Sequence, residues 1–189
     1  MSPLETVLRP LGRALIHRRA GLERSVRSAP ALQSPNRMPM SSTSFADGGE
    51  IPAIHSPLGK GRNLSPALSW SDVPAGTRQL LFVMEDVDVP SRLPSLHVSM
   101  LFGPEVTGFA EGEISPDNAA LRFIPRMGRV GWFGPRPLPG HGPHRYGFHL
   151  YAIDIAIPAT TKLTAFAQVL PLVDGHLLAS GLLVGVQED

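Results

Sequence analysis

Residues 131–154 read GWFGPRPLPGHGPHRYGFHLYAID. The first half, residues 131–143, holds four glycines and four prolines. Glycine permits backbone conformations that other residues resist, and proline fixes φ, so this half predicts a stiff, turning loop. Residues 145–155 predict a strand that follows without a break, in which alternate apolar side chains share one face. A rigid loop that delivers His, Arg and Tyr side chains onto the end of a core strand indicates a binding site.

The composition around this stretch is that of one loop-rich domain. The chain has 189 residues and is 42% hydrophobic, enough to bury one core. It has 19 glycines and 20 prolines, and only 17% of its residues are charged, which favours a β-rich protein over a helical bundle. There are no cysteines, which excludes disulfides, thiolate metal sites and cysteine nucleophiles.

The charge is unevenly distributed along the chain. Residues 1–40 carry seven arginines and two glutamates, a balance of +5, while the remaining ten basic and fourteen acidic residues give −4. The body is therefore not a general nucleic-acid binder. No apolar run reaches the roughly 18–20 residues that span a bilayer. The N-terminus also lacks the apolar core of a secretory signal, so we expect a cytoplasmic protein.

The basic N-terminus predicts a separate helical element. Leucines recur at helical spacing over residues 3–27, with arginines on the other face. We expect an amphipathic helix that packs on the domain or on a partner subunit, which would make a homodimer. A mitochondrial-type presequence and a helix in peripheral contact with a membrane are the alternatives. Residues 28–37 predict a linker, so we divide the chain into residues 1–37 and a domain of residues 38–189.

The rest of the chain predicts more strands than helices. Besides residues 145–155, strands are expected at 67–71, 79–84, 96–102 and 182–186, and helices at 162–170 and 172–180. Short strands separated by turns favour antiparallel β packing.

Polar side chains gather where three of these strands begin or end. Asp86 and Asp88 follow one strand, His97 starts the next, and His144 and Tyr146 lie at the start of a third. Their spacing in the sequence does not show whether these side chains meet in space. Each could equally be a polar side chain packed in a loop with no role in binding. If they converge, two imidazoles, a phenol and a carboxylate make a pocket suited to a small anion such as phosphate. The carboxylate would raise the pKa of an imidazole.

Several motifs occur in a family-specific order. They are NLSPALSW at 63–70, Asp86-x-Asp88-x-Pro90, His97, GPRPLPGHGPHRY at 134–146, and DGHLLA at 174–179. Together they resemble the phosphatidylethanolamine-binding protein family, in particular its bacterial Raf-kinase-inhibitor-like branch, over roughly residues 40–187. The chain departs from the family pattern at Val87, Val89 and Leu96.

The resemblance implies a fold and a site. The fold would be mainly β with peripheral helices, an antiparallel two-sheet sandwich of Greek-key type. The site would bind phosphate-like head groups without a metal or other cofactor. Its ligand-binding residues would be Asp86, Pro90, His97, Gly134, Pro135, His144 and Tyr146. Arg145 would be structural, because strand alternation points it away from His144 and Tyr146.

Three functions are weighed on this basis. The first is a non-enzymatic binding protein for a small anionic ligand, phosphate or phosphoethanolamine-like, that modulates partner proteins. The second is a hydrolase in which His141, His144 and His149 with Asp86 hold a metal. The chain has neither a helical His-x-x-x-His nor a Gly-x-Ser-x-Gly elbow to support it. The third is an interaction or inhibitor module assembled through the N-terminal helix.

Overall fold

Two antiparallel sheets form the centre of the computed structural model, which describes residues 3–57 and 60–189. The larger sheet has the spatial order β6-β4-β3-β7-β8 and the smaller one β1-β2-β5. The larger sheet consists of β3 (Gln79–Asp86), β4 (Ser95–Phe102), β6 (Arg122–Phe123), β7 (His144–Ile153) and β8 (Leu177–Gln187); the smaller consists of β1 (Met40–Ser41), β2 (Leu68–Trp70) and β5 (Gly108–Phe109). The predicted mainly-β, two-sheet fold is confirmed.

Strand β3 explains why the larger sheet is covered on both faces. Its residues QLLFVMED form a nearly unbroken apolar run, and all but the first are buried, as in a strand with no solvated face. Leu80 and Phe82 point into one core, and Leu81 and Val83 point into another. The first core fills the space between the two sheets, where the rings of Trp70, Phe102 and Phe109 pack against each other.

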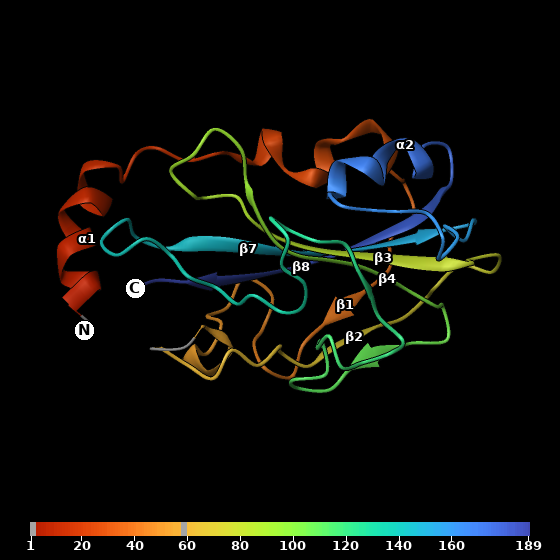
Figure 1. Ribbon diagram of the computed structural model, residues 1–189, viewed down its shortest axis with the longest axis horizontal. Helices are drawn as coiled ribbons and strands as arrows, with labels where there is room; N and C mark the ends of the chain where they lie inside the picture. The colour runs from red at the N-terminus through yellow and green to blue at the C-terminus, as the bar shows by residue number, and fades with distance from the viewer. Residues whose placement is uncertain (1–2, 58–59) are drawn as a thin grey trace.

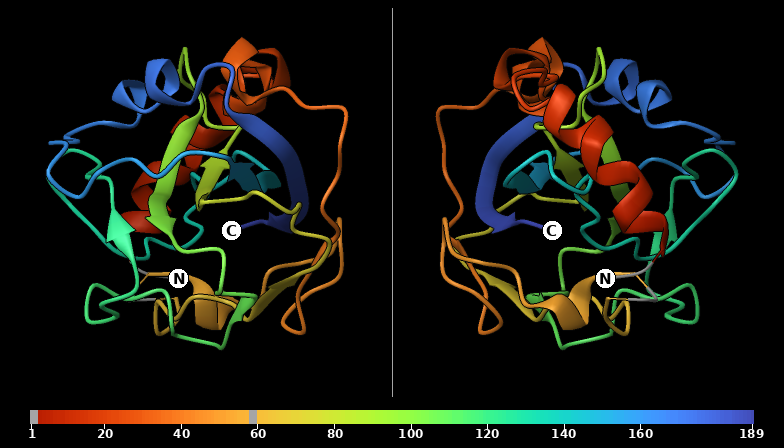
Figure 2. Two further views of the ribbon diagram at one scale, coloured as in Figure 1. Left: turned by 90° about the vertical axis from the view of Figure 1, so that its right-hand side faces the viewer. Right: turned by 90° about the vertical axis from the view of Figure 1, so that its left-hand side faces the viewer.

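The second core lies on the other face of the larger sheet, under a layer of short helices (Figure 1). This layer contains α2 (Leu170–Val173) and the 3-10 helices η1 (Leu22–Arg24), η2 (Val26–Ser28), η3 (Pro30–Leu32) and η5 (Phe166–Gln168); a further 3-10 helix, η4 (Ala53–His55), lies elsewhere. Leu32, Tyr151 and Val173 are among the side chains buried there. The molecule therefore has three layers, with the larger sheet in the middle (Figures 1 and 2).

The predicted helix over residues 3–27 is too long. Helix α1 spans Pro3–Ala14, after which the chain turns and meets the loop that follows β3. Ala20 N–H donates to Val89 O and Gly21 N–H donates to Val87 O, both at 2.9 Å. Gly21 has φ of 94°, which a helix does not tolerate. Tertiary hydrogen bonds at this point override the helical periodicity.

The segment predicted as a linker, residues 28–37, instead packs on the larger sheet. The side chains of Ser34 and Asn36 both donate to Leu178 O. The backbone of Arg37 forms an isolated parallel β-bridge with that of Ser180. The division into residues 1–37 and 38–189 stays a prediction, but the first part is continuous with the second core.

Helix α1 lies at the end of the larger sheet where β7 begins (Figure 1). A side chain at Gly12 would collide with the backbone of Pro139, so the helix lies directly against the 131–143 loop. Val7 is 74% exposed and remains an apolar surface that a second subunit or a membrane could cover. The homodimer and the membrane contact therefore stay predictions. Within the described ranges, no helix is both long and apolar enough to cross a bilayer.

The predicted C-terminal helices are also wrong. Residues 162–170 contain only η5 and the first residue of α2, and residues 172–180 contain only the end of α2 before β8 begins at Leu177. Asp174 leaves the helical conformation, and Gly175 follows with φ of 78°. The chain then pairs with β7 over the whole length of that strand, from Leu177 against Ile153 to Gln187 against His144. Backbone pairing with a neighbouring strand outweighs the local helical pattern.

Candidate functional site

Asp86 and His144 form a buried pair at the edge of the first core. Asp86 ends β3 and lies opposite Tyr146 of β7 in the sheet register. Its Oδ2 is 2.7 Å from Nδ1 of His144, and its Oδ1 accepts the Asp88 N–H at 2.8 Å. Both side chains of the pair are 1% exposed. The 131–143 loop and the sheet register therefore bring together two groups that lie 58 residues apart in the sequence.

His141 extends this pair toward the N-terminal segment. Its Nδ1 lies 2.7 Å from His144 Nε2, and its Nε2 lies 2.9 Å from Leu15 O and 3.0 Å from Arg18 O. Carbonyl oxygens only accept, so His141 carries its proton on Nε2 and accepts at Nδ1 from His144. Burial lowers the pKa of His141, while the bond to Arg18 O opposes the shift. His144 then donates from Nε2 to His141, and its Nδ1 lies against the Asp86 carboxyl group.

His97 and Tyr146 lie side by side next to this pair. The two rings meet edge to face with centroids 5.4 Å apart. His97 Nδ1–H donates to Phe133 O at 2.8 Å and to Gly134 O at 3.2 Å, so Nε2 is the ring's remaining acceptor. The Tyr146 hydroxyl is buried and forms no hydrogen bond of regular geometry among the described residues, although the Asp86 side chain and the Arg136 backbone lie near it. Burial, followed by the charge of Asp86, raises the pKa of Tyr146 well above its ordinary value.

Asp88 binds two arginines beside the cluster. Its carboxylate accepts from Nε and Nη2 of Arg145, both at 2.8 Å, and lies 3.2 Å from Nη1 of Arg19. Burial alone would raise the pKa of Asp88, but the hydrogen bonds to Arg145 and the two positive charges hold it below its ordinary value. The structural role predicted for Arg145 matches this geometry. Arg19 also donates to Pro143 O at 2.9 Å, so the N-terminal segment is fastened to both halves of the site.

The Gly-Pro loop forms the wall beside His97. Gly134 N–H donates to Asn63 Oδ1 at 3.1 Å, and a Cβ at Gly134 would collide with the carbonyl of His55. Only glycine fits there. Pro135 is buried next to it. Pro90 is half-buried in the loop after β3, joined to the cluster by no hydrogen bond within the described residues, and the peptide bond before it is trans.

The structure gathers four of the predicted site residues: Asp86, His97, His144 and Tyr146. The sequence assigned His141 only to the alternative metal site, whereas it contacts His144 directly. Neither Arg19 nor the carbonyls of Leu15 and Arg18 were expected, because backbone acceptors leave no signal in a sequence. The excess of arginines before residue 40 is the one feature of the sequence that indicates a contact between this segment and acidic groups of the domain.

His149 does not join the cluster. It lies on the opposite face of β7, with Nε2 3.0 Å from Glu85 Oε1, because strand alternation separates it from His144. The set proposed for a metal-dependent hydrolase is therefore divided between two faces of the sheet. Across residues 3–57 and 60–189, no group of three or more His, Asp or Glu side chains is arranged to hold a metal ion.

The buried histidines predict a loss of stability in mild acid. Burial lowers the pKa of His97, opposed by the charge of Asp86, and burial also lowers that of His141. Below about pH 6.5 the unfolded chain binds protons at these two histidines and the folded chain does not. The free energy of unfolding therefore decreases as the pH is lowered. Each histidine contributes at most about 1.4 kcal/mol per pH unit.

The replacement His97→Asn keeps an N–H near the position of Nδ1 and removes the titration. We expect urea unfolding at about pH 7.5 and about pH 5.5 to show a smaller difference for this variant than for the wild type. Equal differences for the two proteins would show that His97 titrates normally in the folded state.

Comparison with known proteins decides the family. A sequence model described as phosphatidylethanolamine-binding protein matches residues 41–188. The chain belongs to the phosphatidylethanolamine-binding protein family. It is 34% identical to a UPF0098 protein of Chlamydia muridarum over 156 residues, which are 80% of this chain and 99% of that protein. The suspected family is thereby confirmed.

Solved structures of this family share the fold. A phosphatidylethanolamine-binding protein homologue of Chlamydia trachomatis, CT736, is 30% identical with a TM-score of 0.69, covering 82% of this chain and 99% of its own. Escherichia coli YbcL, described as a member of the mammalian family, is 23% identical with a TM-score of 0.70, covering 81% and 99%. The family match begins at residue 41, so α1 and the segment up to residue 40 lie outside it.

Proposed function

We propose that this chain is a non-enzymatic binding protein that holds a small anion, phosphate or the phosphate of a head group, at the cluster of Asp86, His97, His144 and Tyr146. The observation that supports this proposal most strongly is the Tyr146 hydroxyl, which is buried and forms no hydrogen bond of regular geometry among the described residues. A buried donor without an acceptor costs free energy, and an anion oxygen removes that cost.

The side chains around Tyr146 suit such a ligand. The Asp86–His144 pair holds an imidazole ring beside the phenol, with ring centroids 6.5 Å apart. His97, 7% exposed, has the largest exposed fraction of the four residues, so we place the ligand on its side of the cluster. A proton taken up at His97 Nε2 would add a second donor toward an anion.

The same geometry favours binding over hydrolysis. A general base needs a nitrogen with a lone pair within reach of the substrate. Both nitrogens of His144 are engaged, one with Asp86 and one with His141. His97 would have to act alone, since the Asp86 carboxylate that could orient it is occupied by His144. Modulation of a partner protein is a further proposal that follows from ligand binding at this site.

Removing the Tyr146 hydroxyl tests the proposal. Titration calorimetry of the wild type with inorganic phosphate and with O-phosphoethanolamine is expected to show binding. Tyr146→Phe is expected to weaken it by about 10-fold or more, because a hydrogen bond to a charged group contributes roughly 1.5–3 kcal/mol. His176→Ala is the control, since His176 pairs with Asp154 just past the far end of β7, with a side chain 42% exposed, and lines neither the cluster nor the cavity on the opposite face of β7. Equal affinity for all three proteins would contradict the proposal.

A further inference from the structure

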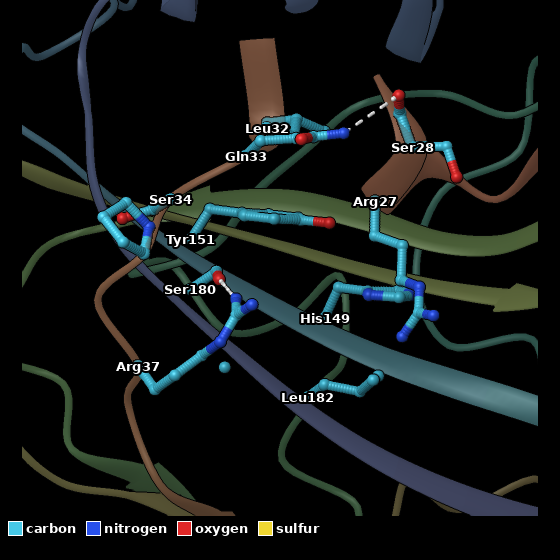
Figure 3. A pocket seen from close by; sticks show the side chains of 12 residues that line it. Arg27, Ser28, Leu32, Gln33, Ser34, Arg37, His149, Tyr151, Ser180 and Leu182 are labelled. Carbon is cyan, nitrogen blue, oxygen red and sulfur yellow. Dashed lines mark hydrogen bonds between the residues drawn. The ribbon is translucent and has the colours of Figure 1, made fainter. Parts of the chain in front are cut away.

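A cavity of about 710 Å³ lies on the face of the larger sheet opposite the Asp86 cluster. Its floor is formed by β7 and β8 and includes His149, Tyr151 and Ser180 (Figure 3). Its other wall is formed by residues 27–37, which fold over the sheet and include Arg27 and Arg37. This wall precedes the region matched by the family model, residues 41–188, so the cavity is built partly from a segment outside the shared domain.

The cavity carries a positive charge. Arg27 and Arg37 both line it, and no acidic side chain lies within ion-pair distance of either in the described part of the chain. Arg37 Nη1 donates to Ser180 Oγ at 2.6 Å, which positions one guanidinium at the rim. The nearest buried acid, Glu85, is already bonded to Ser25 Oγ and to the Val26 N–H.

Two buried polar groups at the floor lack partners. Tyr151 is 1% exposed, and its hydroxyl has no hydrogen-bond partner among the described residues. Figure 3 shows this hydroxyl directed toward the side of the cavity where Arg27 lies. The His149 ring stacks on the Tyr151 ring, with centroids 6.1 Å apart. Nε2 of His149 lies 3.0 Å from Oε1 of Glu85, but the two atoms do not have the geometry of a hydrogen bond. An oxygen acceptor in the cavity would satisfy the Tyr151 donor.

Apolar side chains complete the lining. Leu32 extends from the N-terminal wall and Leu182 from β8 (Figure 3). A pocket with a few polar groups among apolar contacts is typical of sites for small organic ligands, and its volume lies in the usual range of roughly 300–1,000 Å³.

We propose that this cavity is a second ligand site, for a small organic anion. Its charged group, a carboxylate or a phosphate monoester, is attracted by Arg27 and Arg37 and accepts a hydrogen bond from Tyr151. Its apolar part contacts Leu32 and Leu182. The proposal is independent of the anion site at Asp86, since the two lie on opposite faces of β7 and share no residue.

Titration calorimetry with benzoate, phenyl phosphate and neutral benzamide tests this site. Tyr146→Phe protein, in which the first site is impaired, is expected to bind at least one of the two anions and to bind benzamide at least about 10-fold more weakly. The anion with the higher affinity identifies the preferred head group.

Adding Arg27→Gln and Arg37→Gln to this protein is expected to weaken anion binding about 10-fold or more, and so is adding Tyr151→Phe. Both arginines are exposed, so their replacement leaves the fold intact, which circular dichroism verifies. The proposal is overturned if neither anion binds Tyr146→Phe protein, if benzamide binds as tightly as the anions, or if the arginine variants bind unchanged.

Discussion

Replacing Glu85 with alanine is expected to lower the free energy of unfolding by about 3–5 kcal/mol and to release residues 20–37 from the sheet. Glu85 has no exposed surface and lies on the face of β3 that the N-terminal segment covers. Its carboxylate accepts from Ser25 Oγ and from the Val26 N–H, and it lies beside His149. Alanine would leave these donors buried without an acceptor.

Two measurements check the Glu85 prediction. Urea unfolding followed by tryptophan fluorescence reports the stability, since Trp70 and Trp132 lie in the first core. Limited trypsin digestion reports the segment, because Arg24 and Arg27 become cleavable once it detaches. Glu85→Gln keeps one acceptor oxygen, so its free energy of unfolding should fall by about half as much as that of Glu85→Ala. Glu23→Ala is the control: Glu23 is exposed and 3.9 Å from Arg24, and such surface pairs contribute about 1 kcal/mol or less.

The outcome for Glu85 decides whether the N-terminal segment is an integral layer. If Glu85→Ala and Glu23→Ala unfold at the same urea concentration, the segment is not fastened through Glu85. The cavity beneath residues 27–37 would then have no fixed wall.

Replacing Asp86 with alanine is the second large effect we expect, again about 3–5 kcal/mol of unfolding free energy. The change removes the acceptor of His144 Nδ1 and that of the Asp88 N–H, both in buried surroundings. It should also weaken phosphate binding, because the His144 ring loses the carboxylate that holds it in place beside Tyr146. Asp86→Asn preserves the shape and should cost less, since a neutral His144 can accept from the amide and still donate to His141.

The chain offers a matched control for Asp86. Asp154 and His176 form a pair of nearly the same length, 2.8 Å between Oδ1 and Nδ1, but with side chains 43% and 42% exposed. Water screens that pair, so Asp154→Ala is expected to cost about 1 kcal/mol or less. Urea unfolding of both variants at about pH 7 compares them directly. Similar losses would mean that burial does not strengthen the Asp86–His144 pair.

Much of the central sheet could be predicted from the sequence. The run at 79–84 and the alternation after His144 each correspond to a strand. The motif residues Asp86, His97, His144 and Tyr146 come together because they lie at the ends of neighbouring strands. Such elements are readable because each strand's pattern reflects the two faces on which it is buried.

The N-terminal segment could not be predicted in the same way. Several of its contacts are made by its own backbone, from Ala20 N–H to Val89 O and from the Leu15 and Arg18 carbonyls to His141, and these depend on no particular side chain of the segment. The helical spacing of its leucines is real, but only residues up to Ala14 follow it. Pairing with β7 also places residues 177–180, expected to be helical, in strand β8. Local patterns do not show which distant strand edge the backbone will meet.

The position of a bound anion tests the central claim most directly. Tungstate has the shape and charge of phosphate-like anions and gives a strong anomalous signal in a crystal. We predict an anomalous peak beside the Tyr146 hydroxyl and His97, absent from crystals of Tyr146→Phe soaked in the same way. Wild-type crystals without a peak at that place, at a concentration that saturates binding in solution, would contradict the assignment of the anion site to this cluster.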